Sequence, residues 1–292
     1  MQLGSNRYGK AEVRVVRVAR GAGPDGGDLI KDWNVSTLLS GDLADSHLTG
    51  DNAKVLPTDS QKNKVYALAK ELGCVQPEPF ARELASFFTS SQEPITRARI
   101  SIDECAWIPI GATGYSFARS GELLRTTTVI QDEARGTSVV SGIKDLVVMN
   151  TTASEFWGYP KDPYTTLPET KNRILATEVN ASWRFRPEAI AGTDWGAAFV
   201  VARQTVLDTF AGTYTYSLQQ MLYAIGGAVL TAVPEVCEVR LALPNKHHFA
   251  VDLSPFGLEN DREVYVAADR PYGLIEGTVL ADDAPDPGLA WT

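Results

Sequence analysis

Two kinds of hydrophobic pattern alternate along this chain. Residues 10–20 and 28–41 are rich in β-branched residues, with roughly alternating hydrophobic and polar positions, and the segment GAGPDGG at 21–27 supplies turn residues between them. This pattern predicts two strands that pair as a β-hairpin with a long tip.

Two helices are predicted next. Over residues 58–73 the apolar side chains recur on one stripe and the pattern ends at a glycine, which is typical of an amphipathic helix and its stop. Thr58 and Gln61 stand at the spacing of a capping box, in which each side chain hydrogen-bonds a free amide of the first turn. A second helix is predicted over residues 77–90, and residues 95–149 then return to strand-like alternation.

The second half of the chain repeats this order of elements. The repeat lies in element order rather than in residue identity, and it predicts an α+β fold with two similar ββααββ domains, residues 1–140 and 141–292. In each domain, amphipathic helices are expected on one face of an antiparallel sheet. The segments predicted as strands are 141–150, 173–185, 236–244, 247–254, 263–269 and 272–280, and those predicted as helices are 194–212 and 216–233.

Composition narrows the class of protein. The chain has 292 residues, of which 44% are hydrophobic, which is enough for one large or two medium cores. The formal net charge is −9 and there is no block of Lys or Arg, so a nucleic-acid partner is not expected. The three cysteines are far apart, which argues against a disulfide framework.

Targeting signals are also missing from the sequence. There is no charged-then-apolar leader and no apolar run of the ~18 residues that a membrane span needs. The last residues, PDPGLAWT, differ from the Ser-Lys-Leu type of peroxisomal address. We therefore expect a soluble cytoplasmic protein with no membrane partner.

The segment LPNKHHFAVDL, residues 243–253, contains two of the three histidines. If it is extended, Asn245, His247 and Phe249 share one face, while His248 points the other way. The apolar companions of His247 predict that it faces inward and His248 outward. Taken alone, an inward histidine fits a hydrogen-bonded core residue better than a site residue.

Three further positions are candidates for an anion site, each with a simpler structural reading. Thr58 and Asp59, at a helix start, fit an N-cap and a dipole partner, but free amides there also suit an anionic ligand. The planar fork of Arg173 suits a carbonyl-bearing anion, although a lone arginine is usually solvated. Lys10 on its own fits an exposed lysine at a strand start. No GxGxxG, P-loop, GxSxG or zinc-spacing motif is present, so neither a metal nor an organic cofactor is expected.

Five segments resemble motifs of the uricase (urate oxidase) family. They are YGKAEVRVVRV, VLPTDSQKNKVYALAKE, FWGYPKDPYTTLPETKNRILATEV, LPNKHHFAVDL and DRPYGLIEGT, in the family's order and within residues 8–279. Residues 90–140 resemble the family least. The resemblance implies two tandem tunnelling-fold (T-fold) domains and a homotetramer whose sheets close into a barrel around a tunnel, with sites at subunit interfaces. It also implies oxidation of urate by O₂ and water to 5-hydroxyisourate and hydrogen peroxide, without a cofactor, in purine degradation.

The resemblance further implies how the chain binds urate. Arg173 resembles the arginine that clamps urate, and Gln219 resembles the glutamine that pairs with the opposite edge of the purine. Phe156 looks like the ring on which urate stacks. Leu218 stands where a backbone amide contacts the ligand, and Ile275 would line the pocket.

Catalytic roles are implied in the same way. Lys10, Thr58 and His247 resemble the family's proton relay. Asn245, together with Thr58, would hold O₂ or peroxide above the ring. Thr58 and Asp59 would reach urate from a neighbouring subunit.

Two other functions fit the same scaffold. A non-catalytic purine-binding protein would be expected to have a broken relay, whereas Lys10, Thr58, Asn245 and His247 are all present. A zinc-using pterin or purine hydrolase would need a Cys/His ligand set, which the sequence lacks.

Overall fold

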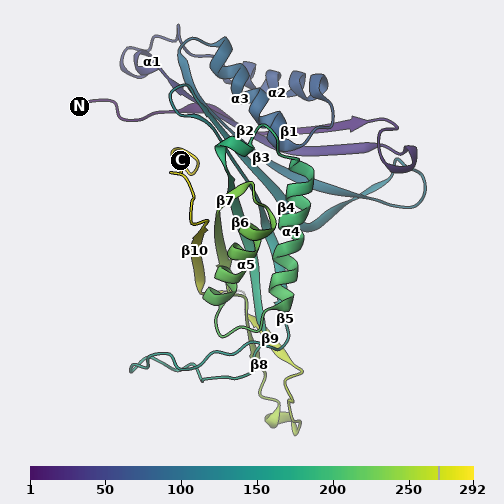
Figure 1. The fold of residues 1–292 in the computed structure, drawn as a ribbon. Helices are drawn as coiled ribbons and strands as arrows, with labels where there is room; N and C mark the ends of the chain where they lie inside the picture. The colour runs from purple at the N-terminus through teal and green to yellow at the C-terminus, as the bar shows by residue number, and fades with distance from the viewer. Residues whose placement is uncertain (269) are drawn as a thin grey trace.

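The computed structural model describes residues 1–268 and 270–292, and its main feature is one long antiparallel sheet (Figure 1). Eight strands lie in the order β1-β2-β3-β4-β5-β6-β7-β10, and β8 pairs with β9 in a separate two-stranded sheet. The strands of the first half are β1 (Tyr8–Ala19), β2 (Leu29–Gly41), β3 (Ile95–Pro109) and β4 (Phe117–Asp132). Those of the second half are β5 (Gly136–Asn150), β6 (Leu175–Phe185), β7 (Val236–Pro244), β8 (His247–Ala250), β9 (Tyr265–Ala268) and β10 (Leu274–Leu280).

Four long helices cover one face of this sheet (Figure 1). In each half two helices follow the first two strands, so the ββααββ order predicted from the sequence is confirmed. The long helices are α2 (Thr58–Leu72), α3 (Pro77–Ser91), α4 (Trp195–Gly212) and α5 (Leu218–Ala232). The short elements are α1 (Ala44–Leu48) and the 3-10 turns η1 (Pro24–Gly26), η2 (Pro187–Ala189) and η3 (Ser254–Phe256). None of the helices in the described ranges is long and apolar enough to cross a membrane.

The predicted elements match the observed ones with a few differences at their ends. The strand predicted over 247–254 is shorter in the structure, where it is β8 and ends at Ala250. It lies outside the main sheet and pairs with β9. The strand predicted over 263–269 is β9, and its last position, 269, lies outside the described residues. The predicted domain boundary after residue 140 falls inside β5, which is hydrogen-bonded to strands on both sides, and the boundary stays a prediction.

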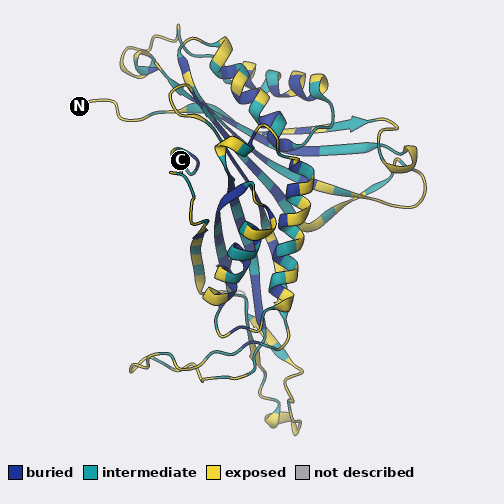
Figure 2. Cartoon of the chain, viewed as in Figure 1, coloured by how far each residue is buried: buried dark blue, intermediate teal, exposed yellow. Residues whose placement is uncertain are grey.

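The core lies between the sheet and the helices, where the buried residues concentrate (Figure 2). Alternate side chains of β2, such as Trp33, Val35 and Leu39, point to the helical side and are fully buried. The ring centroids of Trp33 and Phe80, on α3, are 4.6 Å apart. This packing is what the alternating pattern of residues 28–41 predicts.

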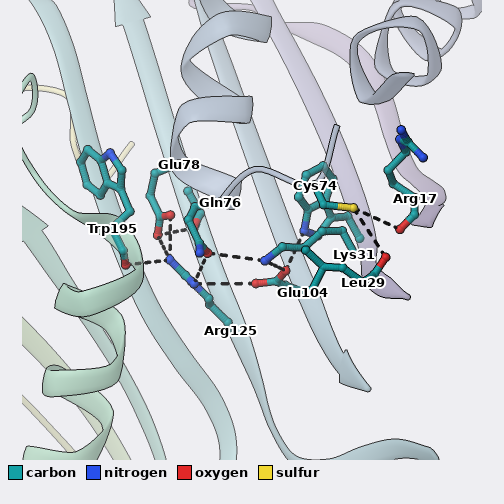
Figure 3. Close-up of polar contacts among 11 residues, drawn as sticks. Arg17, Leu29, Lys31, Cys74, Gln76, Glu78, Glu104, Arg125 and Trp195 are labelled. Carbon is teal, nitrogen blue, oxygen red and sulfur yellow. Dashed lines mark hydrogen bonds and ion pairs between the residues drawn. The ribbon is translucent and has the colours of Figure 1, made fainter. Parts of the chain in front are cut away.

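A buried polar cluster, centred on one ion pair of the first half, joins the two halves of the fold (Figure 3). Arg125 of β4 lies 2.8 Å from the carboxylate of Glu78 on α3, and the two side chains are only 7% and 1% exposed. Arg125 also donates to the side chain of Gln76 at 2.8 Å and to the carbonyl of Trp195, at the start of α4, at 3.1 Å. Ser141 of β5 donates to Glu78 at 2.6 Å. One polar cluster thus fixes α3, α4 and the seam between β4 and β5.

Candidate active site

Lys10 lies near the start of β1, at one edge of the main sheet. Its backbone N–H donates to the hydroxyl of Thr37 at 3.2 Å, and that hydroxyl donates to the side chain of Gln61 on α2 at 2.7 Å. A side chain on Gly9 would lie 1.7 Å from the carbonyl oxygen of Thr37, so only glycine allows this approach of the two strands. Lys10 is therefore held next to the first turns of α2.

The start of α2 differs from the predicted capping box. Pro57 is the N-cap, no side chain caps the helix, and the side chain of Gln61 is fully buried against Thr37. The capping-box prediction is wrong because the hydrogen bond to β2 takes the side chain of Gln61. Thr58 is half-buried, and its hydroxyl forms no hydrogen bond within the described part of the chain.

Asp59 lies in the first turn of α2, as predicted, and its side chain is exposed. A hydrogen bond from Lys62 is the largest cause that lowers the pKa of its carboxyl, and the charge of Lys10 is a smaller one. This influence indicates that Lys10 and Asp59 lie in one neighbourhood. We call Lys10, Thr58 and Asp59 the first half-site.

Arg173 lies just before β6, at the other end of the molecule. Its Nε donates to the hydroxyl of Ser154 at 3.2 Å, and its Cζ is 5.0 Å from the centroid of the Phe156 ring. Tyr159 stacks on Phe156 at 4.8 Å between centroids. Burial lowers the pKa of Arg173 from its ordinary value, yet a guanidinium remains charged at neutral pH. A partly buried cation beside an aromatic face suits a planar anion.

Asn245 and His247 lie beside this arginine. Asn245 forms an isolated bridge with Thr177 of β6, and its N–H donates to the carbonyl of Gly273 at 2.8 Å. Desolvation is the largest cause that lowers the pKa of His247, followed by the charges of Arg173 and His248. His247 is therefore neutral at neutral pH and able to accept a proton.

The interpretation of His247 as a core histidine is wrong, because both histidines are only half-buried in the β8–β9 hairpin. The two rings do differ in their contacts. His247 stacks on Phe249 at 5.7 Å, whereas Nδ1 of His248 lies 2.9 Å from the carbonyl of Lys246.

The remaining predicted residues lie at the same end of the sheet. Leu218 is the first residue of α5 and is buried, and Gln219 follows it with an exposed side chain. Ser217 caps this helix by accepting from the N–H of Gln220 at 3.1 Å. Ile275 of β10 pairs with Leu243 of β7. We call the following residues the second half-site: Phe156, Arg173, Leu218, Gln219, Asn245, His247 and Ile275.

The two half-sites lie at diagonal corners of one chain. Five strand spacings separate β1 from β6, which is about 25 Å across the sheet. Lys10 pairs with Thr37, Thr37 pairs with Ile100, and Ile100 pairs with Val129. This row of partners continues across the sheet toward the Arg184 end of β6. The second half-site lies at the opposite end of β6, near Leu175. These two ends of β6 are about 30 Å apart. Figure 1 shows the same separation, with β1 and α2 at the upper end and β8 and β9 at the lower end.

Sequence reasoning missed the residues that support the second half-site. Ser154 and Tyr159 touch Arg173 and Phe156, but neither belongs to a motif that spacing alone would identify. In the described ranges, no group of three or more His, Cys, Asp or Glu residues is arranged to hold a metal ion.

The chain thus has an α+β fold in which two groups of candidate anion-binding residues lie at far corners of one antiparallel sheet. The family model described as Uricase matches residues 6–130 and 139–276. A uricase of Arthrobacter globiformis is 44% identical over 99% of this chain and 93% of its own length. A uricase of Dictyostelium discoideum is 38% identical over 94% of this chain and 96% of its own.

Solved structures agree with these sequence relatives. The crystal structure of uricase from Arthrobacter globiformis superposes with a TM-score of 0.94 at 42% identity, covering 100% of this chain and 99% of that one. The chain belongs to the uricase family.

Proposed function

We propose that this chain is a urate oxidase that completes each active site with residues from two copies. The reaction is urate, O₂ and water to 5-hydroxyisourate and hydrogen peroxide. Urate loses two electrons and gains one hydroxyl oxygen from water, and O₂ takes the two electrons and two protons. Family membership supports this activity over a non-catalytic purine-binding role.

Urate binding is assigned to the second half-site. Urate is a planar monoanion at neutral pH, so the Arg173 fork can bind one edge while the Gln219 amide reads the donors and acceptors of the other. The phenyl ring of Phe156 covers the ring face. The backbone amide of Leu218, at the N-terminus of α5, adds a donor with the favourable dipole of a helix start. Ile275 closes the pocket.

Proton transfer needs both half-sites. A more fully deprotonated urate gives up electrons to O₂ more readily, so the protein must remove a proton and hold O₂ close. We assign a relay to Lys10, Thr58 and His247, in which the neutral imidazole accepts protons through the free hydroxyl of Thr58 and water. The amide of Asn245, with Thr58, holds O₂ and then peroxide above the ring. Asp59 reaches the same ligand through the helix-start groups of α2.

The separation of the half-sites is the observation that carries the two-copy assignment. Lys10 and Thr58 cannot reach Arg173 or His247 across about 25 Å of their own sheet. A twofold-related copy solves this, because each pair of chains then forms two equivalent sites.

The edges of the sheet support the same assembly. Strands β1 and β10 form the two edges and leave unpaired backbone groups, with Val16 57% and Leu280 56% exposed. Exposed sheet edges are usually covered or paired. Edge pairing between copies would close a barrel, which fits the homotetramer predicted from the sequence. The cytoplasmic location stays a prediction.

The test mixes purified protein with urate in air, with a chelator and no added metal, and follows the urate absorbance band together with peroxide. Loss of urate with equal formation of peroxide is expected. Urate that binds but persists would favour the non-catalytic role, and protein that neither binds nor consumes urate would refute the substrate.

A further inference from the structure

Ser154 connects the two segments that carry the anion-binding groups. It is fully buried, and it contacts Arg173 twice. Its hydroxyl accepts from Nε of Arg173 at 3.2 Å, and its carbonyl accepts from the Arg173 backbone N–H at 2.9 Å. Both the backbone and the guanidinium of this arginine are thus tied to one residue.

The other side of Ser154 is tied to the start of α5. Ser154 forms a parallel bridge with Thr215, which is also fully buried, and the N–H of Glu155 donates to the carbonyl of Thr215 at 2.9 Å. The hydroxyl of Thr215 donates to the carbonyl of Ser217, the N-cap of α5, at 2.6 Å. Ser154 therefore sets the position of Arg173 relative to the helix start that carries Gln219.

The hydrogen bond to Nε decides which edge of the guanidinium is available. Arg173 has no carboxylate partner, and its two Nη groups have no hydrogen bond, within residues 1–268 and 270–292. With Nε taken, the two Nη groups form the free edge, and this edge can bind a carbonyl-bearing anion with two parallel hydrogen bonds. Without that bond the guanidinium is free to turn over the Phe156 ring, 5.0 Å away.

We propose that Ser154 is a positioning residue that orients the Arg173 fork toward urate. The inference rests on the proposed function, because it assumes that Arg173 binds urate. Ser154 itself touches no substrate and acts only through the arginine. Since Arg173 binds the anion before and during the reaction, its misalignment weakens both states alike, and this raises KM without lowering kcat.

Ser154→Ala removes the hydroxyl with little change in volume. Its KM for urate is expected to rise about tenfold while kcat stays within about twofold, because a hydrogen bond to a charged group is lost. Ser154→Cys fills the same space with a weaker acceptor, and its KM is expected to rise in the same direction. It provides a second variant if the alanine variant folds poorly.

A double-mutant cycle separates positioning from a general structural effect. Arg173→Lys has no Nε and no fork, so Ser154→Ala is expected to change the KM of that background by less than about twofold. An equal rise in both backgrounds would overturn the proposal, as would a KM of Ser154→Ala within twofold of wild type.

Ser141→Ala is the matched control. Ser141 is also a buried serine that hydrogen-bonds a charged partner, Glu78 at 2.6 Å, but it lies away from both half-sites. Its thermal midpoint is expected to fall with KM unchanged.

Anaerobic equilibrium dialysis with urate distinguishes failure of the proposed function from failure of the role proposed for Ser154. Failure of the wild type to oxidise urate refutes the proposed function, whereas equal urate affinity of wild type and Ser154→Ala refutes the role of Ser154.

Discussion

Arg125→Met tests the ion pair at the centre of the buried polar cluster that joins the two halves of the fold. The substitution keeps much of the side-chain volume but removes the only cation 2.8 Å from Glu78 among the described residues. Glu78 is 1% exposed and would keep its hydrogen bonds from Thr127, at 3.1 Å, and Ser141, at 2.6 Å. A carboxylate left buried without its cation typically costs about 3–5 kcal/mol of stability.

The loss of stability is measurable as a fall in the thermal midpoint at fixed protein concentration, since the proposed assembly would make the midpoint depend on concentration. For a chain of this size, about 3–5 kcal/mol corresponds to a fall of roughly 5–8 °C. Arg203→Met is the matched control, because Arg203 pairs with Glu122 between α4 and β4 while its side chain and that of Glu122 are 30% and 46% exposed. An exposed pair contributes about 0–1 kcal/mol, so the midpoint of Arg203→Met is expected to move by no more than about 2 °C. Equal shifts in the two variants would refute the stabilising role assigned to the buried Arg125–Glu78 pair.

Three predictions concern the proton relay. Lys10→Met is expected to lower kcat by about a hundredfold or more with KM within threefold, and a near-normal kcat would exclude Lys10 from the relay. Because desolvation and nearby positive charge disfavour protonated His247, its neutral form persists to lower pH. The acid limb of a kcat/KM profile is therefore expected below the usual histidine pKa of about 6.5, and a limb above that value would contradict the role of His247. His248→Ala is expected to retain activity and assembly, whereas lost activity in an intact assembly, checked by size-exclusion chromatography, would mean that the two histidines were assigned the wrong way round.

Local signals explain how much of the fold the sequence predicts. The stripe of apolar residues over 58–73 and the alternation over 28–41 each report a periodicity that burial on one face imposes, so α2 and β2 are predicted to within one residue of their observed bounds. The departure of β8 from the main sheet could not be predicted, because its partner β9 is set by pairing about twenty residues away rather than by local pattern.

The residues of the candidate site were likewise predicted only in part from the sequence. The residue types and positions of Thr58, Asp59 and Arg173 suggested an anion site, and the family resemblance supplied the roles of these residues and of Asn245 and His247. Long-range contacts decided the rest. Gln61 leaves its expected capping position because Thr37 lies 2.7 Å away on β2. Ser154 has no local signal, because its partner Arg173 is nineteen residues further along the chain.

The most direct test of the two-copy site mixes two variants that are each expected to be inactive, Lys10→Met in the first half-site and Arg173→Gln in the second. In a mixed pair, one site receives both substitutions and the other receives neither. Random pairing makes half of the pairs mixed, so co-expression is predicted to restore about one quarter of wild-type kcat per site. Co-assembled variants that stay inactive would contradict the account, because both half-sites would then have to belong to the same chain.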